Sequence, residues 1–208
     1  MALATFNDLR DSIADWLNRA DLAAVIPDFI TLSEARFNRE LRLAQMVKVA
    51  TATVSDGYFA VPSDHLQTIS LRLTSPDNYN GKCEFVSIQR LNELNGNPNL
   101  TNTSRYYSIV DGNFRLAPSP SGETTLELTY YAKVPALSFD NQTNWLLTKA
   151  PDLYLYGSLM QAAPYLKDDE RVALWATAMG QAMEALQLEA ERAQFPEGKL
   201  NATRRTFG

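Results

Sequence analysis

Hydrophobic residues recur three or four positions apart near both ends of the chain and two positions apart in between. Near the amino terminus, Thr5 is a good helix N-cap, with Asp8 three residues later as in a capping box. The apolar stripe that follows predicts an amphipathic helix near residues 5–18, with Phe6, Leu9, Ile13, Trp16 and Leu17 on one face. A second stripe, with Pro27 tolerated in its first turn, predicts a helix near residues 25–43.

The middle of the chain, residues 47–132, has the period of β-strands. Apolar and polar residues alternate over 69–73 and again over 126–131, as expected for strands that bury one face. Asp56-Gly57 and Asp111-Gly112 lie between such runs, and a two-residue Asp-Gly turn has the twist of an antiparallel hairpin. These features predict an antiparallel meander with polar loops at 74–82 and 92–104, and a short helix around Arg90 to Leu94.

Helical spacing returns after Pro151 and predicts helices near residues 151–164 and 168–195. The second would be about 40 Å long at 1.5 Å per residue. We therefore expect an α+β fold in which the N- and C-terminal helices form a helical bundle with a central antiparallel β insertion. The expected parts are helices in 1–46, a β-rich insertion in 47–147, helices in 148–195 and an extended basic tail in 196–208. The expected buried residues of the bundle are Trp16, Phe37, Leu159, Trp175 and Met179.

Composition and charge narrow the class of protein. Of the 208 residues, 45% are hydrophobic and 21% are charged, which is typical of a folded globular protein. The net charge of -5 argues against a dedicated nucleic-acid-binding protein. Residues 196–208 carry three basic side chains and one acidic one, 3 - 1 = +2, which leaves -7 for the rest. No apolar run approaches the length of a membrane span, and the amino terminus lacks the pattern of a signal peptide, so we expect no membrane association.

Each group of residues that could carry chemistry has a better structural explanation. Ser63, Asp64 and His65 contain the residue types of a nucleophilic triad, but neighbouring residues of an extended chain point to opposite sides. The acidic residues 168–170 open a long helix, where carboxylates cap free N–H groups and oppose the helix dipole. Cys83 is the single cysteine and is typical of a small apolar residue near a strand. We therefore predict no catalytic, cofactor-binding or metal-binding residues and no enzymatic activity.

Tyrosines are more informative about binding than the ionisable residues. The pairs 106–107 and 130–131 each place one ring on either face of a predicted strand. A tyrosine that points outward offers apolar area with a polar tip, which suits a contact surface. Candidate contacts with neighbouring copies or with a tail protein are Tyr79, Tyr106 and Tyr131, and ordinary cross-strand packing is the alternative for these rings.

One segment resembles a known family. Residues 152–171, DLYLYGSLMQAAPYLKDDER, precede Trp175 and a long helix rich in Ala, Met, Leu and Glu. Together with residues 59–64, FAVPSD, and with Phe37 and Leu41 in the opening helices, this layout resembles the head-to-tail adaptor (connector or neck) proteins of short-tailed bacteriophages.

The resemblance implies a structural protein of the virion that is assembled in the host cytoplasm. Such adaptors form a homo-oligomeric ring of twelve copies in the neck, between portal protein and tail or nozzle protein, and genomic DNA passes through the lumen without sequence-specific binding. Two other functions stay open from the residues alone: a neck-associated cell-wall hydrolase, and a helical binding module unrelated to phages.

The C-terminal segment is the remaining candidate site. It is basic and too polar to fold alone, which fits the arm that adaptors extend along the portal. A frayed, solvated tail is the alternative. The residues expected to bind the portal are Lys199, Leu200, Arg204, Arg205 and Phe207.

Overall fold

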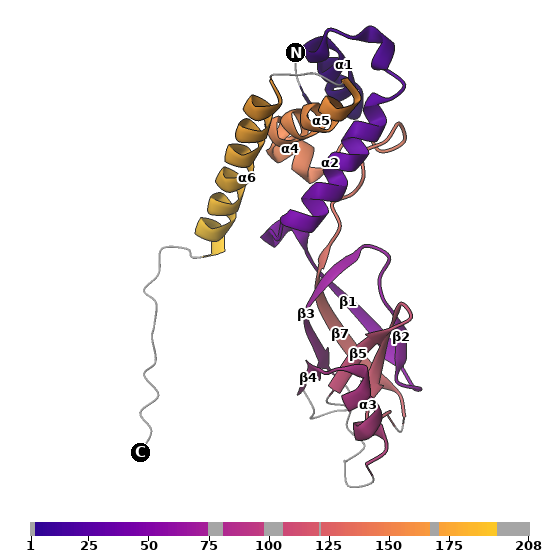
Figure 1. Ribbon diagram of the computed structural model, residues 1–208. Helices are drawn as coiled ribbons and strands as arrows, with labels where there is room; N and C mark the ends of the chain where they lie inside the picture. The colour runs from indigo at the N-terminus through magenta and orange to yellow at the C-terminus, as the bar shows by residue number, and fades with distance from the viewer. Residues whose placement is uncertain (1–2, 75–80, 98–105, 121, 167–170, 195–208) are drawn as a thin grey trace. The chain divides into compact units, whose positions relative to one another are not determined.

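The computed structural model describes residues 3–74, 81–97, 106–120, 122–166 and 171–194 (Figure 1). The chain forms two compact units. The helical unit combines residues 1–44 with residues 134–208, and the β unit contains residues 45–133.

The helical unit is built from both ends of the described chain. Its α-helices are α1 (Phe6–Leu17), α2 (Ile26–Glu40), α4 (Trp145–Lys149), α5 (Pro151–Leu166) and α6 (Val172–Gln194), with a short 3-10 turn η1 (Ala20–Leu22). The predicted capping box at the start of α1 is confirmed, because Asp8 N donates to Thr5 Oγ1 at 3.1 Å and Thr5 N donates to Asp8 Oδ2 at 3.0 Å. Pro27 lies in the first turn of α2, as predicted.

Helix α5 lies at the centre of this unit and contacts α1, α2, α4 and α6. It is apolar on nearly all sides, as expected of a helix surrounded by others. Gly157 marks the closest approach, because a β-carbon built there would lie 3.0 Å from Cζ of Phe37 on α2. The small residue therefore allows α2 and α5 to pack closely.

Helix α6 packs against α5 through one narrow stripe, spaced four and three residues apart in the manner of a coiled coil. The fully buried members of the stripe are Trp175, Met179, Leu186 and Ala190. Burial of Phe37, Leu159, Trp175 and Met179 is thus confirmed. Burial of Trp16 is wrong: its side chain is 47% exposed, because it lies in the last turn of α1, where one edge of the indole contacts Tyr156.

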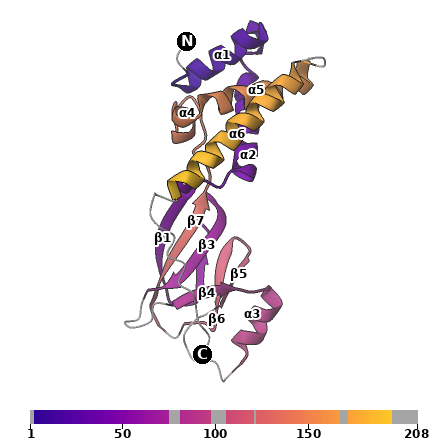
Figure 2. The ribbon, with the colours of Figure 1, turned by 90° about the vertical axis from the view of Figure 1, so that its left-hand side faces the viewer.

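The β unit is a single seven-stranded sheet with the order β1-β7-β3-β4-β5-β6-β2 (Figure 2). The strands are β1 (Val47–Val54), β2 (Tyr58–Ala60), β3 (His65–Leu73), β4 (Gly81–Phe85), β5 (Tyr106–Val110), β6 (Asn113–Ala117) and β7 (Thr124–Ala132). A 3-10 turn, η2 (Ala44–Met46), precedes β1, and helix α3 (Ile88–Asn95) lies between β4 and β5 in sequence, where the short helix was predicted.

The predicted fold class is wrong in its architecture. The chain is a mixed α+β protein whose seven strands form a nearly closed sheet with its own core, not a helical bundle that carries a small antiparallel insertion. Strands β4 and β5 pair in parallel, so the sheet is not a meander. Strands β1 and β2 are the two edges of the sheet, yet only residues 55–57 separate them in sequence, which requires the sheet to curl until its edges approach one another.

The predicted hairpin turn at Asp111-Gly112 is confirmed, whereas the one at Asp56-Gly57 is a turn but not a hairpin. Asp111 and Gly112 both have positive φ, 50° and 69°, and join β5 to β6 as the predicted two-residue hairpin turn. Gly57 also has positive φ, but β1 and β2 on either side of it do not pair with each other. Strand β1 pairs with β7 and β2 pairs with β6. The Asp56-Gly57 turn therefore connects two strands that pair with different neighbours.

A β-bulge in β3 alters the predicted alternation. The register with β7 shifts between Thr68 and Ser70, which leaves Ile69 as the extra residue, 42% exposed. Leu71 and Leu73 beyond the bulge are buried as predicted.

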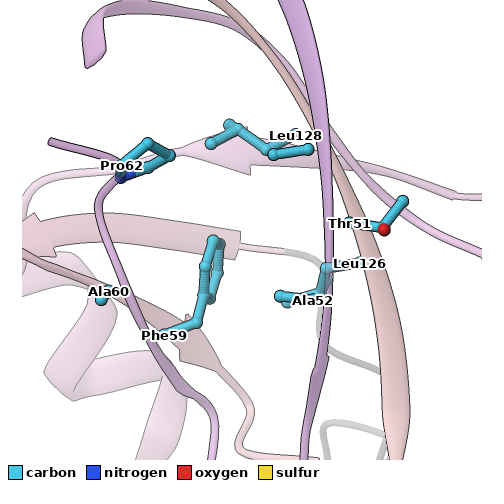
Figure 3. A pocket seen from close by; sticks show the side chains of 8 residues that line it. Thr51, Ala52, Phe59, Ala60, Pro62, Leu126 and Leu128 are labelled. Atoms are coloured by element: carbon cyan, nitrogen blue, oxygen red, sulfur yellow. The ribbon is translucent and has the colours of Figure 1, made fainter. Parts of the chain in front are cut away.

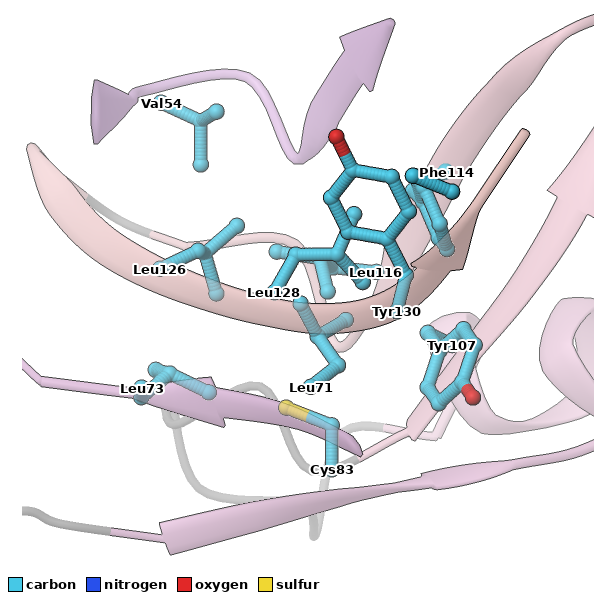
Figure 4. Packing of buried hydrophobic residues seen from close by; sticks show 11 residues of the cluster. Val54, Leu71, Leu73, Cys83, Tyr107, Phe114, Leu116, Leu126, Leu128 and Tyr130 are labelled. Carbon is cyan, nitrogen blue, oxygen red and sulfur yellow. The ribbon is translucent and has the colours of Figure 1, made fainter. Parts of the chain in front are cut away.

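The core of the β unit lies on the concave side of the curled sheet and receives alternate residues of β7 (Figure 4). It consists of Val54, Leu71, Leu73, Cys83, Tyr107, Phe114, Leu116, Leu126, Leu128, Tyr130 and Ala132. A smaller cluster of Leu91, Leu94 and Ala117 lies under α3.

Replacement of Trp175 with Ala tests the packing of α6 on α5. The indole is 2% exposed, so its removal should lower the free energy of unfolding by about 3 to 5 kcal/mol. Gln187 on the same helix is exposed, and Gln187→Ala should change that free energy by no more than about 0.5 kcal/mol. Denaturant titrations followed by circular dichroism measure both, and equal effects of the two substitutions would contradict this packing.

Candidate interaction surfaces

The seam between the two edge strands holds an apolar pocket (Figure 3). Ala50, Thr51 and Ala52 of β1 lie on one side of it, and Phe59 and Ala60 of β2 lie on the other. Pro62, Leu126 and Leu128 complete the lining. Thr51 has the one polar side chain among these lining residues, whereas sites for small substrates typically have several convergent polar groups.

A few exposed apolar side chains lie among polar ones on the outer face of β1, β7 and β3. Val47 and Val49 are 38% and 61% exposed, and Val47 lies directly opposite Tyr131 in the antiparallel ladder. On the other side of β7, Tyr131 pairs with Gln67, two positions before the bulged Ile69. Tyr131 is half-buried between Val47 on one side and Gln67 on the other, so its ring offers apolar area with a polar tip on a mixed surface.

The other predicted contact residues have different surroundings. Tyr106 is half-buried and packs against the cluster under α3. Tyr79 and the predicted portal-binding residues Lys199, Leu200, Arg204, Arg205 and Phe207 lie outside the described residues.

His65 and Asp64 take part in structural contacts instead of a triad. Asp64 accepts hydrogen bonds from Lys48 Nζ at 2.6 Å and from the Tyr130 hydroxyl at 2.9 Å, and the bond from Lys48 is the main cause that lowers the pKa of this carboxyl. The His65 ring stacks on Tyr130 at 5.5 Å between centroids, and its Nε2 lies 2.9 Å from Thr68 Oγ1. Burial lowers the pKa of His65 and so favours the neutral ring, although the nearby Asp64 acts in the opposite direction. These contacts fix the turn that leads into β3.

Cys83 and the acidic residues also lack the settings of reactive groups. The Cys83 thiol is buried in the β core, and burial raises its pKa to about 12, which keeps it protonated at neutral pH. Residues 168–170 lie outside the described part of the chain. Within the part that is described, no group of three His, Cys, Asp or Glu side chains could hold a metal ion.

One buried carboxyl escaped the sequence reasoning. Glu34 on α2 is 4% exposed, and its Oε1 accepts hydrogen bonds from Leu137 N at 2.8 Å and from the Tyr154 hydroxyl at 3.0 Å. Asn144 Nδ2 donates to the same Tyr154 oxygen at 2.7 Å and also to the carbonyl oxygen of Pro135 at 2.7 Å. This network fastens residues 135–144 to α2 and α5. The signal in the sequence was a Glu on the buried face of a helix, between Ile30 and Phe37.

Burial sets the charge of this carboxyl. Desolvation raises the pKa of Glu34 to about 7, although the hydrogen bonds from Leu137 N and Tyr154 act in the opposite direction. No basic side chain is among its hydrogen-bond partners in the described residues. The carboxyl therefore changes its charge near neutral pH inside the helical unit.

The described residues combine exposed apolar side chains with polar side chains in structural contacts, in two units with separate cores. A family model described as SU10 adaptor protein matches residues 4–204. The chain belongs to this family and is a phage adaptor protein, a structural component of the virion. No curated protein matches the chain. None of the described helices is long and apolar enough to cross a membrane.

The Glu34 network predicts a specific dependence of stability on pH. The folded protein holds the proton of Glu34 up to about pH 7, whereas an unfolded chain releases it near pH 4.5, so stability falls as the pH rises through this window and then levels off. Across this pH window, the unfolding free energy of the wild type should fall by roughly 3 kcal/mol more than that of Glu34→Gln.

Urea titrations at several pH values measure this difference. Glu191→Gln, which changes an exposed carboxylate of α6, is the matched control and should keep the wild-type profile. Parallel profiles for wild type and Glu34→Gln would show that Glu34 has an ordinary pKa.

Proposed function

We propose that this adaptor forms a ring of identical copies that joins the portal to the tail in the neck of a short-tailed phage. The observation that carries the proposal is the family match, which extends over residues 4–204 and so includes both units. A head-to-tail adaptor must hold two different partners. Two units with separate cores suit that task, since each can present its own binding surface.

The role is structural, and the protein catalyses no reaction. Binding energy would come from a modest contact repeated in every copy and closed by rotational symmetry, twelve-fold in the form we favour. Genomic DNA would pass through the lumen without base-specific contacts, in keeping with the negative net charge of the chain.

The β unit offers a surface for the tail or for neighbouring copies. Val47, Val49 and Ile69 are exposed apolar residues on the same face as Tyr131, and such side chains gain free energy when another protein covers them. Tyr106 and Tyr79 stay candidate contacts of the same kind.

The C-terminal segment would bind the portal. Lys199, Arg204 and Arg205 would meet carboxylate or carbonyl oxygens, and Leu200 and Phe207 would enter apolar grooves. A segment of this composition cannot offset its own ordering entropy, so it would order only on its partner.

Deletion of residues 197–208 tests the portal contact. The thermal stability of the remaining protein should be nearly unchanged, because the deleted segment supplies few apolar residues to a core. Attachment to DNA-filled heads should be lost, as measured by co-sedimentation of the protein with purified heads. A full-length variant with Asn201→Ala and Thr203→Ala is the control and should still attach. Normal attachment and normal yields of infectious particles with the truncated protein would contradict the proposal.

A further inference from the structure

Helix α6 has a second stripe of mainly apolar residues, interrupted by Gln181, that is largely exposed in the described part of the chain. Leu174 and Leu188 are 67% and 45% exposed, and Ala178 and Ala185 lie between them with the same heptad-like spacing as the buried stripe. At 100° per residue, this second stripe lies roughly 100–120° around the helix from Trp175 and Met179. A helix that packs one apolar stripe on a neighbouring helix and exposes a second stripe is suited to pack between two partners.

Helix α2 also has an outward face. Phe29, Ser33 and Phe37 face α5, where Phe29 contacts Tyr165 and Phe37 contacts Tyr154. Leu32 is 50% exposed and lies about 100° from Ser33, on a stripe that continues to Arg39. Helices α2 and α6 both contact α5 and lie on either side of it in Figure 1.

The charges on the two faces are complementary. Arg39, near the end of α2, and Glu184 and Glu191, in the second half of α6, are exposed. Among the described residues, none of the three forms an ion pair. Both helices run in the same general direction (Figures 1 and 2). If Leu32 is aligned with Leu174, the basic end of α2 therefore lies along the acidic half of α6.

We infer that the outward face of α6 in one copy packs on the outward face of α2 in the next copy, head to tail. The inference rests on the proposed ring and names its contact. Neighbours in a ring differ by a fraction of a turn, so helices that run together within one copy also run together across the contact. Leu32 inserts beside Leu174 and Ala178, and Arg39 pairs with Glu184.

Disulfide trapping tests this contact directly. A variant with Leu32→Cys and Leu174→Cys in the same chain, oxidised mildly at high protein concentration, should give a ladder of covalent dimers, trimers and larger species on a non-reducing gel. Leu32→Cys alone and Leu174→Cys alone should not even give a covalent dimer, because a head-to-tail contact never brings identical positions together. The native Cys83 is buried and should not contribute. Absence of a ladder from the double variant, with Leu32→Cys/Ala178→Cys as the alternative register, would refute the contact.

Charge reversal provides the second test. Arg39→Glu and Glu184→Arg should each weaken self-association by roughly tenfold, measured by sedimentation velocity. An equimolar mixture of the two variants should associate again, because each faulty face then meets its complement. Asp15→Arg, an exposed change on α1, should have no effect. If reversal has no effect but the protein still occupies the virion neck, the α2–α6 contact is wrong and the adaptor function stands. If the protein self-associates as inferred but is absent from the neck, the proposed function is wrong instead.

Discussion

The burial of α5 on nearly all sides is the constraint on which the helical unit depends. A helix with apolar residues around its whole circumference must be surrounded, and here α1, α2, α4 and α6 supply the cover. The close approach of Phe37 to Gly157 fixes α2 on one side, and the stripe around Trp175 fixes α6 on another. In the contact that we propose between copies, the exposed faces of α2 and α6 would meet.

The buried polar network adds specificity to this packing. Residues 135–144 have few regular hydrogen bonds of their own, and the side chains of Glu34 and Asn144 supply partners for their backbone. A carboxyl with a pKa near 7 costs stability when it ionises, which an apolar residue at the same position would not. The hydrogen bonds of Glu34 and Asn144 fix the path of the chain between the end of β7 and the start of α4.

Local signals in the sequence predicted much of the secondary structure. The Thr5-Asp8 capping box and the Asp111-Gly112 turn depend on residues three or fewer positions apart, so the local sequence was enough to place them. The local sequence could not predict the strand order, because strand pairing depends on residues that are distant in sequence. Strand β2 pairs with β6 and not with β1, which precedes it in the chain. The bulge at Ile69 likewise depends on the partner strand β7, and the exposure of Trp16 depends on where α1 ends.

The candidate functional residues also differ in how far the local sequence could predict them. Tyr131 could be proposed from alternation alone, because the period of a strand fixes which face a residue occupies. Glu34 could not, since its partners Leu137 and Tyr154 lie more than a hundred residues away in sequence. The outward faces of α2 and α6 also needed the structure, which shows that α5 covers only one side of each.

A cryo-electron microscopy reconstruction of the virion neck tests the central claim most directly. The account predicts a closed ring of this chain between portal and tail, with the α6 helix of each copy against the α2 helix of the next. A reconstruction in which the chain is absent from the neck, or is present there without forming a ring, would contradict the account.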